Sequence, residues 1–198
     1  FNFCGKVFII PNGVDDNIDS APFDLLKKKY NLPDNFILCA GRIEYRKNQL
    51  ELLKAAKELG FNVVLAGKVN NKEKKYFRQL HDFNFLHISG MPQNELFGLY
   101  SGCRAHVLPS WFETPGLSSL EAAFCGAQIV TTDRGCTKEY FGDNAFYCNP
   151  EDYKSIKAAL KNSMEHPKDP DLLTDLIRNN YTWKIAAEKT LKAYNSIL

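Results

Sequence analysis

Two carboxylates flank a predicted helix start in the stretch WFETPGLSSLEAAFCG, residues 111–126. Glu113 lies in a segment interrupted by proline and glycine, and Glu121 lies in the apolar, helix-like run that follows. Carboxylates accept hydrogen bonds from sugar hydroxyls. The free amides at a helix start favour an anion such as phosphate. The stretch therefore predicts a site for a ligand with a sugar at each end of a diphosphate.

The phosphate would be held by the backbone amides around Gly116, Leu117 and Ser118. A purely structural explanation competes with this one, because Ser118 and Glu121 also match the S-x-x-E capping box. In that interpretation the Glu121 side chain reaches back to the cap amide and binds no ligand.

A second group of candidate residues follows the predicted strand FILCA. Gly41 ends that strand, Arg42 comes next, and Lys47 stands at the start of the following helical pattern. Two cations beside a helix N-terminus suit an anion. The structural alternative is that both pair on the surface with Glu44 and Glu51.

These residues depend on an alternation of short apolar runs with longer amphipathic segments. Near-continuous apolar runs are typical of strands in a parallel sheet that is covered on both faces. Repeated strand–helix alternation predicts a Rossmann-like, doubly wound α/β domain, in which ligands bind at the carboxyl ends of the strands. The predicted strands are residues 6–10, 36–40, 62–66, 85–89, 105–109, 128–132 and 145–148, and the predicted helices are 47–59, 72–81, 93–100, 118–125 and most of the chain after 151.

Bulk composition excludes several classes of protein. The 198 residues suffice for one domain, and 44% hydrophobic and 24% charged residues are ordinary for a globular protein. A net charge of +2 without an extended basic block argues against a nucleic-acid binder. The six cysteines form no CxxC pair and the four histidines show no ligand spacing, so we expect reduced thiols and no metal. No run reaches membrane-spanning length, and neither GxGxxG nor the P-loop motif occurs.

Several motifs in order resemble the nucleotide-sugar half of retaining GT-B glycosyltransferases of the group 1, or family 4, type. The resemblance covers the chain from about Val7 to the C-terminus. The motifs are PNGVD (11–15), AGR (40–42) with Lys47 five residues after the arginine, Ser89-Gly90 before Glu95-Leu96, and Glu113-x7-Glu121 followed by AAFCG.

The resemblance implies a role for each matching residue. Arg42 and Lys47 hold the donor diphosphate, and Glu113 contacts hydroxyls of the transferred sugar, so these three form the catalytic part of the site. Glu121 binds the ribose hydroxyls, and the backbone at Met91 contacts the base. The implied donor-binding set is Gly41, Arg42, Lys47, Met91, Glu113, Gly116, Leu117, Ser118 and Glu121.

The implied reaction moves a hexose from a UDP-, GDP- or ADP-linked sugar to a hydroxyl of a saccharide or lipid-linked acceptor, in polysaccharide or glycoconjugate synthesis. Cations and a helix N-terminus aimed at the leaving diphosphate would stabilise its growing charge, so neither a cofactor nor a metal is expected. The expected location is the cytoplasm, with possible association with the inner face of the membrane and no nucleic-acid partner. An inactive nucleotide-sugar-binding or regulatory module and a GT-B epimerase are the alternatives.

The resemblance also implies that this chain is one half of an enzyme. We expect residues 1–198 to form a single donor-binding domain, inactive alone, whose C-terminal helix at 181–198 crosses back to a separate N-terminal acceptor domain. The chain departs from the family pattern at Thr114-Pro115-Gly116, where glycine-phenylalanine-glycine is common. Because Pro115 has no amide hydrogen, contacts to phosphate must begin at Gly116.

Overall fold

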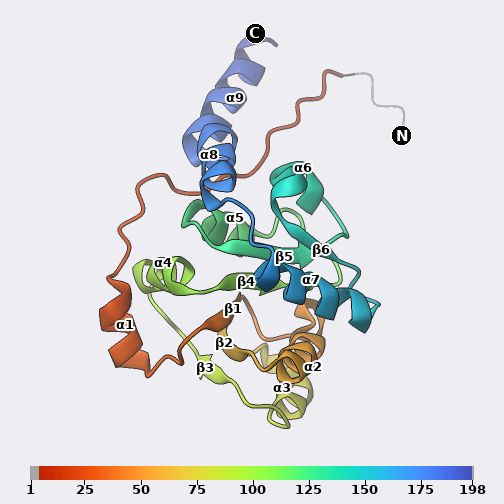
Figure 1. The fold of residues 1–198 in the computed structure, drawn as a ribbon. Helices are drawn as coiled ribbons and strands as arrows, with labels where there is room; N and C mark the ends of the chain where they lie inside the picture. Colours follow the sequence, from red (N-terminus) through yellow and green to blue (C-terminus); the bar gives the residue numbers. More distant parts are fainter. Residues whose placement is uncertain (1–4, 198) are drawn as a thin grey trace.

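Six short apolar runs form one parallel sheet in the computed structural model, which describes residues 5–197 (Figure 1). The strand order is β3-β2-β1-β4-β5-β6, and every neighbouring pair is parallel. From β1 the chain adds β2 and β3 on one side, and β4, β5 and β6 then follow on the other side of β1. The topological switch point of this doubly wound sheet therefore lies between β1 and β4. The predicted fold class is therefore confirmed. The strands are β1 (Phe36–Ala40), β2 (Asn62–Ala66), β3 (Leu86–Ile88), β4 (Ala105–Leu108), β5 (Gln128–Thr132) and β6 (Phe146–Cys148).

Helices cover both faces of this sheet, which explains why the strands are apolar on both sides. In β1, Phe36, Leu38 and Ala40 face one core cluster, whereas Ile37 and Cys39 face the other. One layer contains α2 (Gln49–Leu59), α3 (Lys74–Leu80) and α7 (Tyr153–Glu165). The opposite layer contains α1 (Phe23–Tyr30), α4 (Gln93–Gly102), α5 (Leu117–Phe124), α6 (Thr137–Phe141) and α8 (Pro170–Asn180), and short 3-10 turns occur at Tyr45–Lys47, Asn71–Glu73 and Gly142–Asn144.

The predicted strands and helices after residue 35 all occur, with ends that match or differ by one or two residues. The chain after residue 151 divides into α7, α8 and α9 (Trp183–Asn195), and the Pro-rich break at 166–171 separates the first two. The short helices α1 and α6 were not predicted as elements. The five cysteines among the described residues are free thiols, and Cys4 lies outside the described part.

The strand predicted at residues 6–10 is wrong. Val7 and Ile9 are 73% and 89% exposed, and this segment joins no strand. It runs instead toward the end of α9, where Lys6 Nζ donates to the Ser196 carbonyl at 2.8 Å. A β-branched composition favours a strand only where a neighbouring strand offers pairing and burial. The chain joins the domain at residues 12–14: Asn12 N donates to the Tyr140 hydroxyl, and the buried Val14 exchanges backbone hydrogen bonds with the turn between α8 and α9.

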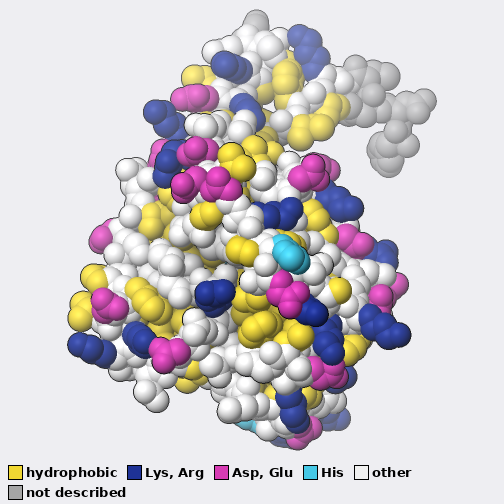
Figure 2. All heavy atoms as spheres, viewed as in Figure 1, with side chains coloured by type: hydrophobic (Ala, Val, Ile, Leu, Met, Phe, Trp, Pro, Cys, Tyr) yellow, Lys and Arg dark blue, Asp and Glu magenta, His cyan; other side chains and the backbone are white. Residues whose placement is uncertain are grey.

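Helix α9 projects from the body of the domain, beside the N-terminal segment (Figure 1). Its apolar side chains are uncovered: Trp183 is 48% exposed, and Leu191 and Tyr194 are each 60% exposed. Figure 2 shows hydrophobic side chains at the surface of this projecting end. Ala193 is the only residue of the described helix that is buried.

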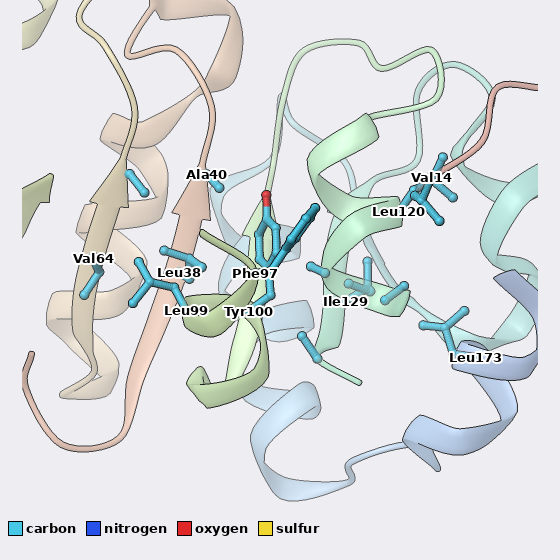
Figure 3. Packing of buried hydrophobic residues seen from close by; sticks show 14 of the residues in the cluster. Val14, Leu38, Ala40, Val64, Phe97, Leu99, Tyr100, Leu120, Ile129 and Leu173 are labelled. Atoms are coloured by element: carbon cyan, nitrogen blue, oxygen red, sulfur yellow. The ribbon is translucent and has the colours of Figure 1, made fainter. Parts of the chain in front are cut away.

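The core between the sheet and the layer of α4 and α5 is closely packed (Figure 3). Leu120 of α5 and Ile129 of β5 are both completely buried. The aromatic side chain of Tyr100 rises from α4 toward the carboxyl ends of the strands, beside Ala40 (Figure 3). This layer thus fixes α5 against the edge of the sheet where the predicted site lies.

We predict that Leu120→Ala lowers the free energy of unfolding by about 2–5 kcal/mol, because it opens a cavity in a packed core. The same change at the 60%-exposed Leu191 should stay within about 0.5 kcal/mol. Urea unfolding of the two variants and the parent measures both values. Similar losses at the two positions would contradict the described packing of α5 and α9.

Candidate functional site

The loop after β4 is held between the loops that follow β1 and β5. Trp111 N donates to the Arg46 carbonyl at 2.9 Å, and the Arg46 guanidinium donates to the Phe112 carbonyl at 2.9 Å. On the other side, Glu113 N donates to the Arg134 carbonyl at 3.3 Å. The three loops therefore converge at the carboxyl edge of the sheet, across the topological switch point.

Glu113 and Lys47 form a buried ion pair in this edge. Lys47 Nζ lies 2.5 Å from Glu113 Oε1, and the two side chains are 12% and 6% exposed. Arg46 is a second cation at 3.6 Å from the same oxygen. The surface pairing that competed with a ligand site is wrong, because Glu44 pairs with Arg46 and Glu51 pairs with Lys54.

Two glycines bring the backbone close to Glu113. A Cβ at Gly135 would overlap the Glu113 carbonyl, so only glycine allows this approach. Gly116 is in the left-handed region with φ +75°, and a Cβ there would lie 3.7 Å from Glu113 Oε2. The Glu113 carboxylate therefore lies between the Lys47 ammonium and the residue that precedes α5.

Helix α5 begins directly after Gly116, so its first amides lie next to this carboxylate. The amides of Leu117 and Ser118 have no acceptor among residues 5–197. The predicted capping box is wrong: Gly116 occupies the N-cap, Ser118 lies inside the first turn, and no side chain caps the helix. The left-handed conformation of Gly116 lets the helix begin earlier than the sequence pattern indicated.

Glu121 is bound to a different partner from the one that the capping pattern required. Its Oε2 accepts a hydrogen bond from the Tyr100 hydroxyl at 3.2 Å. Burial raises the pKa of Glu121, and the Tyr100 hydrogen bond opposes this in part. The side chain is half-buried on the face of α5 that meets α4, one turn after Leu117.

The remaining predicted residues lie along the same edge. Arg42 is exposed, and its guanidinium makes no ion pair within the described part of the chain, whereas Gly41 lies against the Lys47 side chain. Met91 lines a pocket of about 170 Å³ together with Gly67 and Gly90, at the ends of β2 and β3. The structure therefore brings Lys47, Glu113 and the start of α5 into contact, with Arg42 and Met91 further along the edge.

His106 is a buried residue behind the site that the sequence analysis did not single out. Its Nε2 accepts from Ala40 N at 3.4 Å, just beyond the last paired residues of β1 and β4, and its Nδ1 lies 3.3 Å from Ser119 Oγ. Burial, with a smaller contribution from the charge of Lys47, lowers the pKa of His106 to about 3. The neutral ring thus ties the end of β1 to the first turn of α5. In the sequence, the only signal that could have indicated this residue is a single histidine inside the apolar run AHVL.

Residues 5–197 contain no group of three or more His, Cys, Asp or Glu side chains arranged to hold a metal ion. Among the helices in that range, none has the length and apolar character needed to cross a bilayer.

Comparison with known proteins places this chain in a family. The family described as Glycosyl transferases group 1 matches residues 22–183. The chain belongs to this family. It is 32% identical over 151 residues to the serotype-specific mannosyltransferase WbdA of Escherichia coli, covering 70% of this chain and 18% of that protein. It is 26% identical over 205 residues to a glycogen synthase of Mycobacterium tuberculosis, covering 96% of this chain and 48% of that protein. This group 1 chain thus spans at most about half the length of these relatives.

Solved structures show the same fold. A sucrose-phosphate synthase from Thermosynechococcus elongatus superposes with a TM-score of 0.85 at 19% identity, over 98% of this chain and 53% of that one. Anabaena HepE in complex with UDP and glucose gives a TM-score of 0.77 at 19% identity, over 94% and 56% of the two chains. The group 1 chain therefore has the fold of one half of a GT-B glycosyltransferase.

The raised pKa of Glu121 predicts a specific dependence of stability on pH. A carboxyl whose pKa is higher in the folded than in the unfolded state lowers stability as the pH rises through the interval between the two values. Glu121→Gln keeps the size and removes this titration. From about pH 4 to pH 7 the parent should lose stability relative to the variant, by about 1.4 kcal/mol for each pKa unit of the shift. Urea unfolding at both pH values measures the difference.

A variant that is less stable than the parent by the same amount at both pH values would contradict this assignment. Glu165→Gln is the matched control, because Glu165 is an exposed glutamate at the end of α7. Its difference from the parent should not change with pH in this way.

Proposed function

We propose that this chain is the donor-binding half of a retaining glycosyltransferase that moves a hexose from a nucleoside-diphosphate sugar to a hydroxyl of a saccharide or lipid-linked acceptor. The observation that carries the proposal is the Glu113 carboxylate held between the Lys47 ammonium and the free amides at the start of α5. A hydroxyl acceptor and a phosphate-binding helix start thus lie side by side, as a sugar diphosphate requires.

The diphosphate would lie between Lys47, Arg42 and the amides of Gly116, Leu117 and Ser118. Cleavage of the bond between the sugar and the diphosphate of the donor leaves negative charge on the departing diphosphate. Fixed cations and helix amides at that position stabilise the transition state, because they need no reorganisation as the charge grows. In this proposal these groups stabilise the charge of the departing diphosphate, a role that a divalent metal has in other enzymes.

The two glutamates would bind hydroxyls rather than act as a nucleophile and an acid. Glu113, paired with Lys47, is an acceptor for hydroxyls of the transferred sugar. Glu121 would accept from the ribose hydroxyls, and the pocket beside Met91 would receive the base. The pocket at the ends of β2 and β3 supports this order, because it lies farther along the same edge than the helix start.

The acceptor site would belong to a separate N-terminal domain of the full-length protein. The apolar side chains of α9 and of residues 7–9 support this part of the proposal, because they are exposed on one projecting end of the domain (Figure 2). Such an exposed apolar surface marks an interaction site. Residues 181–198 would cross to that domain, in an enzyme that acts in the cytoplasm or at the inner face of the membrane.

Calorimetric titration of the chain with UDP, GDP and ADP, with and without their sugars, tests donor binding. We predict that at least one nucleoside diphosphate binds and that its nucleoside binds much more weakly. If none of the three binds, the donor-site assignment is wrong. Binding by the chain without sugar transfer by the full-length protein would instead favour an inactive nucleotide-sugar-binding module.

Neutral substitution of the cations tests the diphosphate contacts. Arg42→Gln should weaken a nucleoside diphosphate about ten- to hundred-fold, the value of a charged hydrogen bond, and leave the nucleoside almost unchanged. Arg104→Gln is the matched control, because Arg104 is exposed at the opposite, amino end of β4. Equal losses for the nucleoside and the diphosphate would count against the proposed contacts.

A further inference from the structure

A second pocket is lined in part by the same loops that hold the donor site. It measures about 280 Å³ and is lined by four aromatic residues, Tyr45, Tyr76, Trp111 and Tyr153. This volume is close to the lower limit of about 300 Å³ for small-molecule sites, so it suits one sugar ring better than a nucleotide. None of the residues assigned to the donor lines this pocket.

The pocket and the donor site share their backbone. Tyr45 stands two residues before Lys47, and Trp111 stands two residues before Glu113. The hydrogen bond from Trp111 N to the Arg46 carbonyl joins these two segments. A ligand in the pocket would therefore contact the same two loops that position the ion pair.

Tyr45 and the two aromatic rings that it contacts, Trp111 and Tyr76, form an aromatic surface in the pocket. The rings of Tyr45 and Trp111 are stacked, with centroids 5.9 Å apart and an angle of 17° between their planes, and Tyr76 meets Tyr45 edge to face. Tyr45 is 60% exposed although it lies against both partners. Aromatic faces of this kind pack against the apolar C–H face of a pyranose, while polar groups at the margin bind its hydroxyls.

Polar groups of the required types surround the aromatic surface. Asn48, Glu51 and Glu151 line the same pocket. Both carboxylates already have a cation, since Lys54 lies 2.7 Å from Glu51 and Arg134 lies 3.4 Å from Glu151. The margin is therefore close to neutral, which favours an uncharged ligand over a phosphate or a free cation.

Trp111 provides an independent indication of a polar ligand. Its Nε1 is buried and has no hydrogen-bond partner among residues 5–197. Buried donors in folded proteins are almost always satisfied, so an unpaired one needs an explanation. A hydroxyl-bearing ligand beside the indole, reached through a small rearrangement, would supply the acceptor.

We propose that this pocket binds an uncharged pyranose unit of the saccharide chain on which the enzyme acts. The proposal rests on the proposed function, because a chain-building transferase has a saccharide as acceptor and product. Binding a sugar here would hold the chain next to the loops that carry Lys47 and Glu113.

The intrinsic fluorescence of Trp111 tests this proposal directly. The sequence contains two tryptophans, so Trp183→Phe leaves Trp111 as the only one. This variant is titrated with linear mannotetraose and, separately, with maltotetraose. At least one of them should change the emission of Trp111, with a dissociation constant in the millimolar range or below.

The contribution of the aromatic surface is tested with Tyr45 in the same background. Tyr45→Ala should weaken the saccharide about ten-fold or more, whereas Tyr45→Phe should keep the affinity because it keeps the ring. Tyr194→Ala is the matched control, since Tyr194 is also 60% exposed but lies on α9. It should leave saccharide binding unchanged.

Absence of any response in the Trp183→Phe parent, or an equal response in Tyr45→Ala, would overturn the proposal. Choline, a small cation, is titrated in the same way. A response to choline but not to either saccharide would also overturn the proposal, and would assign a cation site instead.

Titration of Tyr45→Ala with the nucleoside diphosphate that binds the parent should give the parent's affinity. Failure of all nucleotides to bind would contradict the proposed donor site, and the fluorescence result distinguishes that failure from a failure of the aromatic pocket.

Discussion

The buried ion pair between Lys47 and Glu113 is the interaction on which the arrangement of this edge depends. Moving two charges out of water is costly, and the cost is recovered only when the charges meet in good geometry. Here a 2.5 Å contact joins the loop after β1 to the loop after β4 across the switch point. Removing Glu113 would leave Lys47 buried without its partner, and removing Lys47 would leave Glu113 with only the more distant Arg46 beside it.

This pair also defines how a diphosphate could enter without leaving Glu113 uncompensated. Lys47 would be attracted to the phosphates, which carry more negative charge than one carboxylate. Arg46 lies 3.6 Å from the same Glu113 oxygen and already bonds the Phe112 carbonyl. A second cation of this kind can hold the carboxylate in place while Lys47 turns to the ligand. Lys47 and Arg46 therefore neutralise the Glu113 carboxylate from within the chain, and Arg46 would remain beside it when Lys47 binds a phosphate.

The sequence alone was sufficient for the sheet and for most of the helices, because apolar runs and their spacing report burial directly. It failed where the outcome depended on a distant partner. The segment 6–10 has strand composition but no strand to pair with, and Glu121 has a capping pattern but bonds Tyr100 on another helix. The partner of Lys47 was likewise out of reach, since Glu113 is 66 residues away and the local pattern offered Glu44 and Glu51.

Three polar groups without a full set of partners lie at or next to the carboxyl edge of the sheet. Arg42 is exposed without an ion pair among the described residues, burial raises the pKa of Glu121, and Trp111 Nε1 is buried without an acceptor. Apart from residues 6–10 and the exposed side of α9, local rules hold in the rest of the fold, so their failure at this edge indicates a function there. In the proposed donor complex, each of these groups would gain a partner from a phosphate or a sugar hydroxyl.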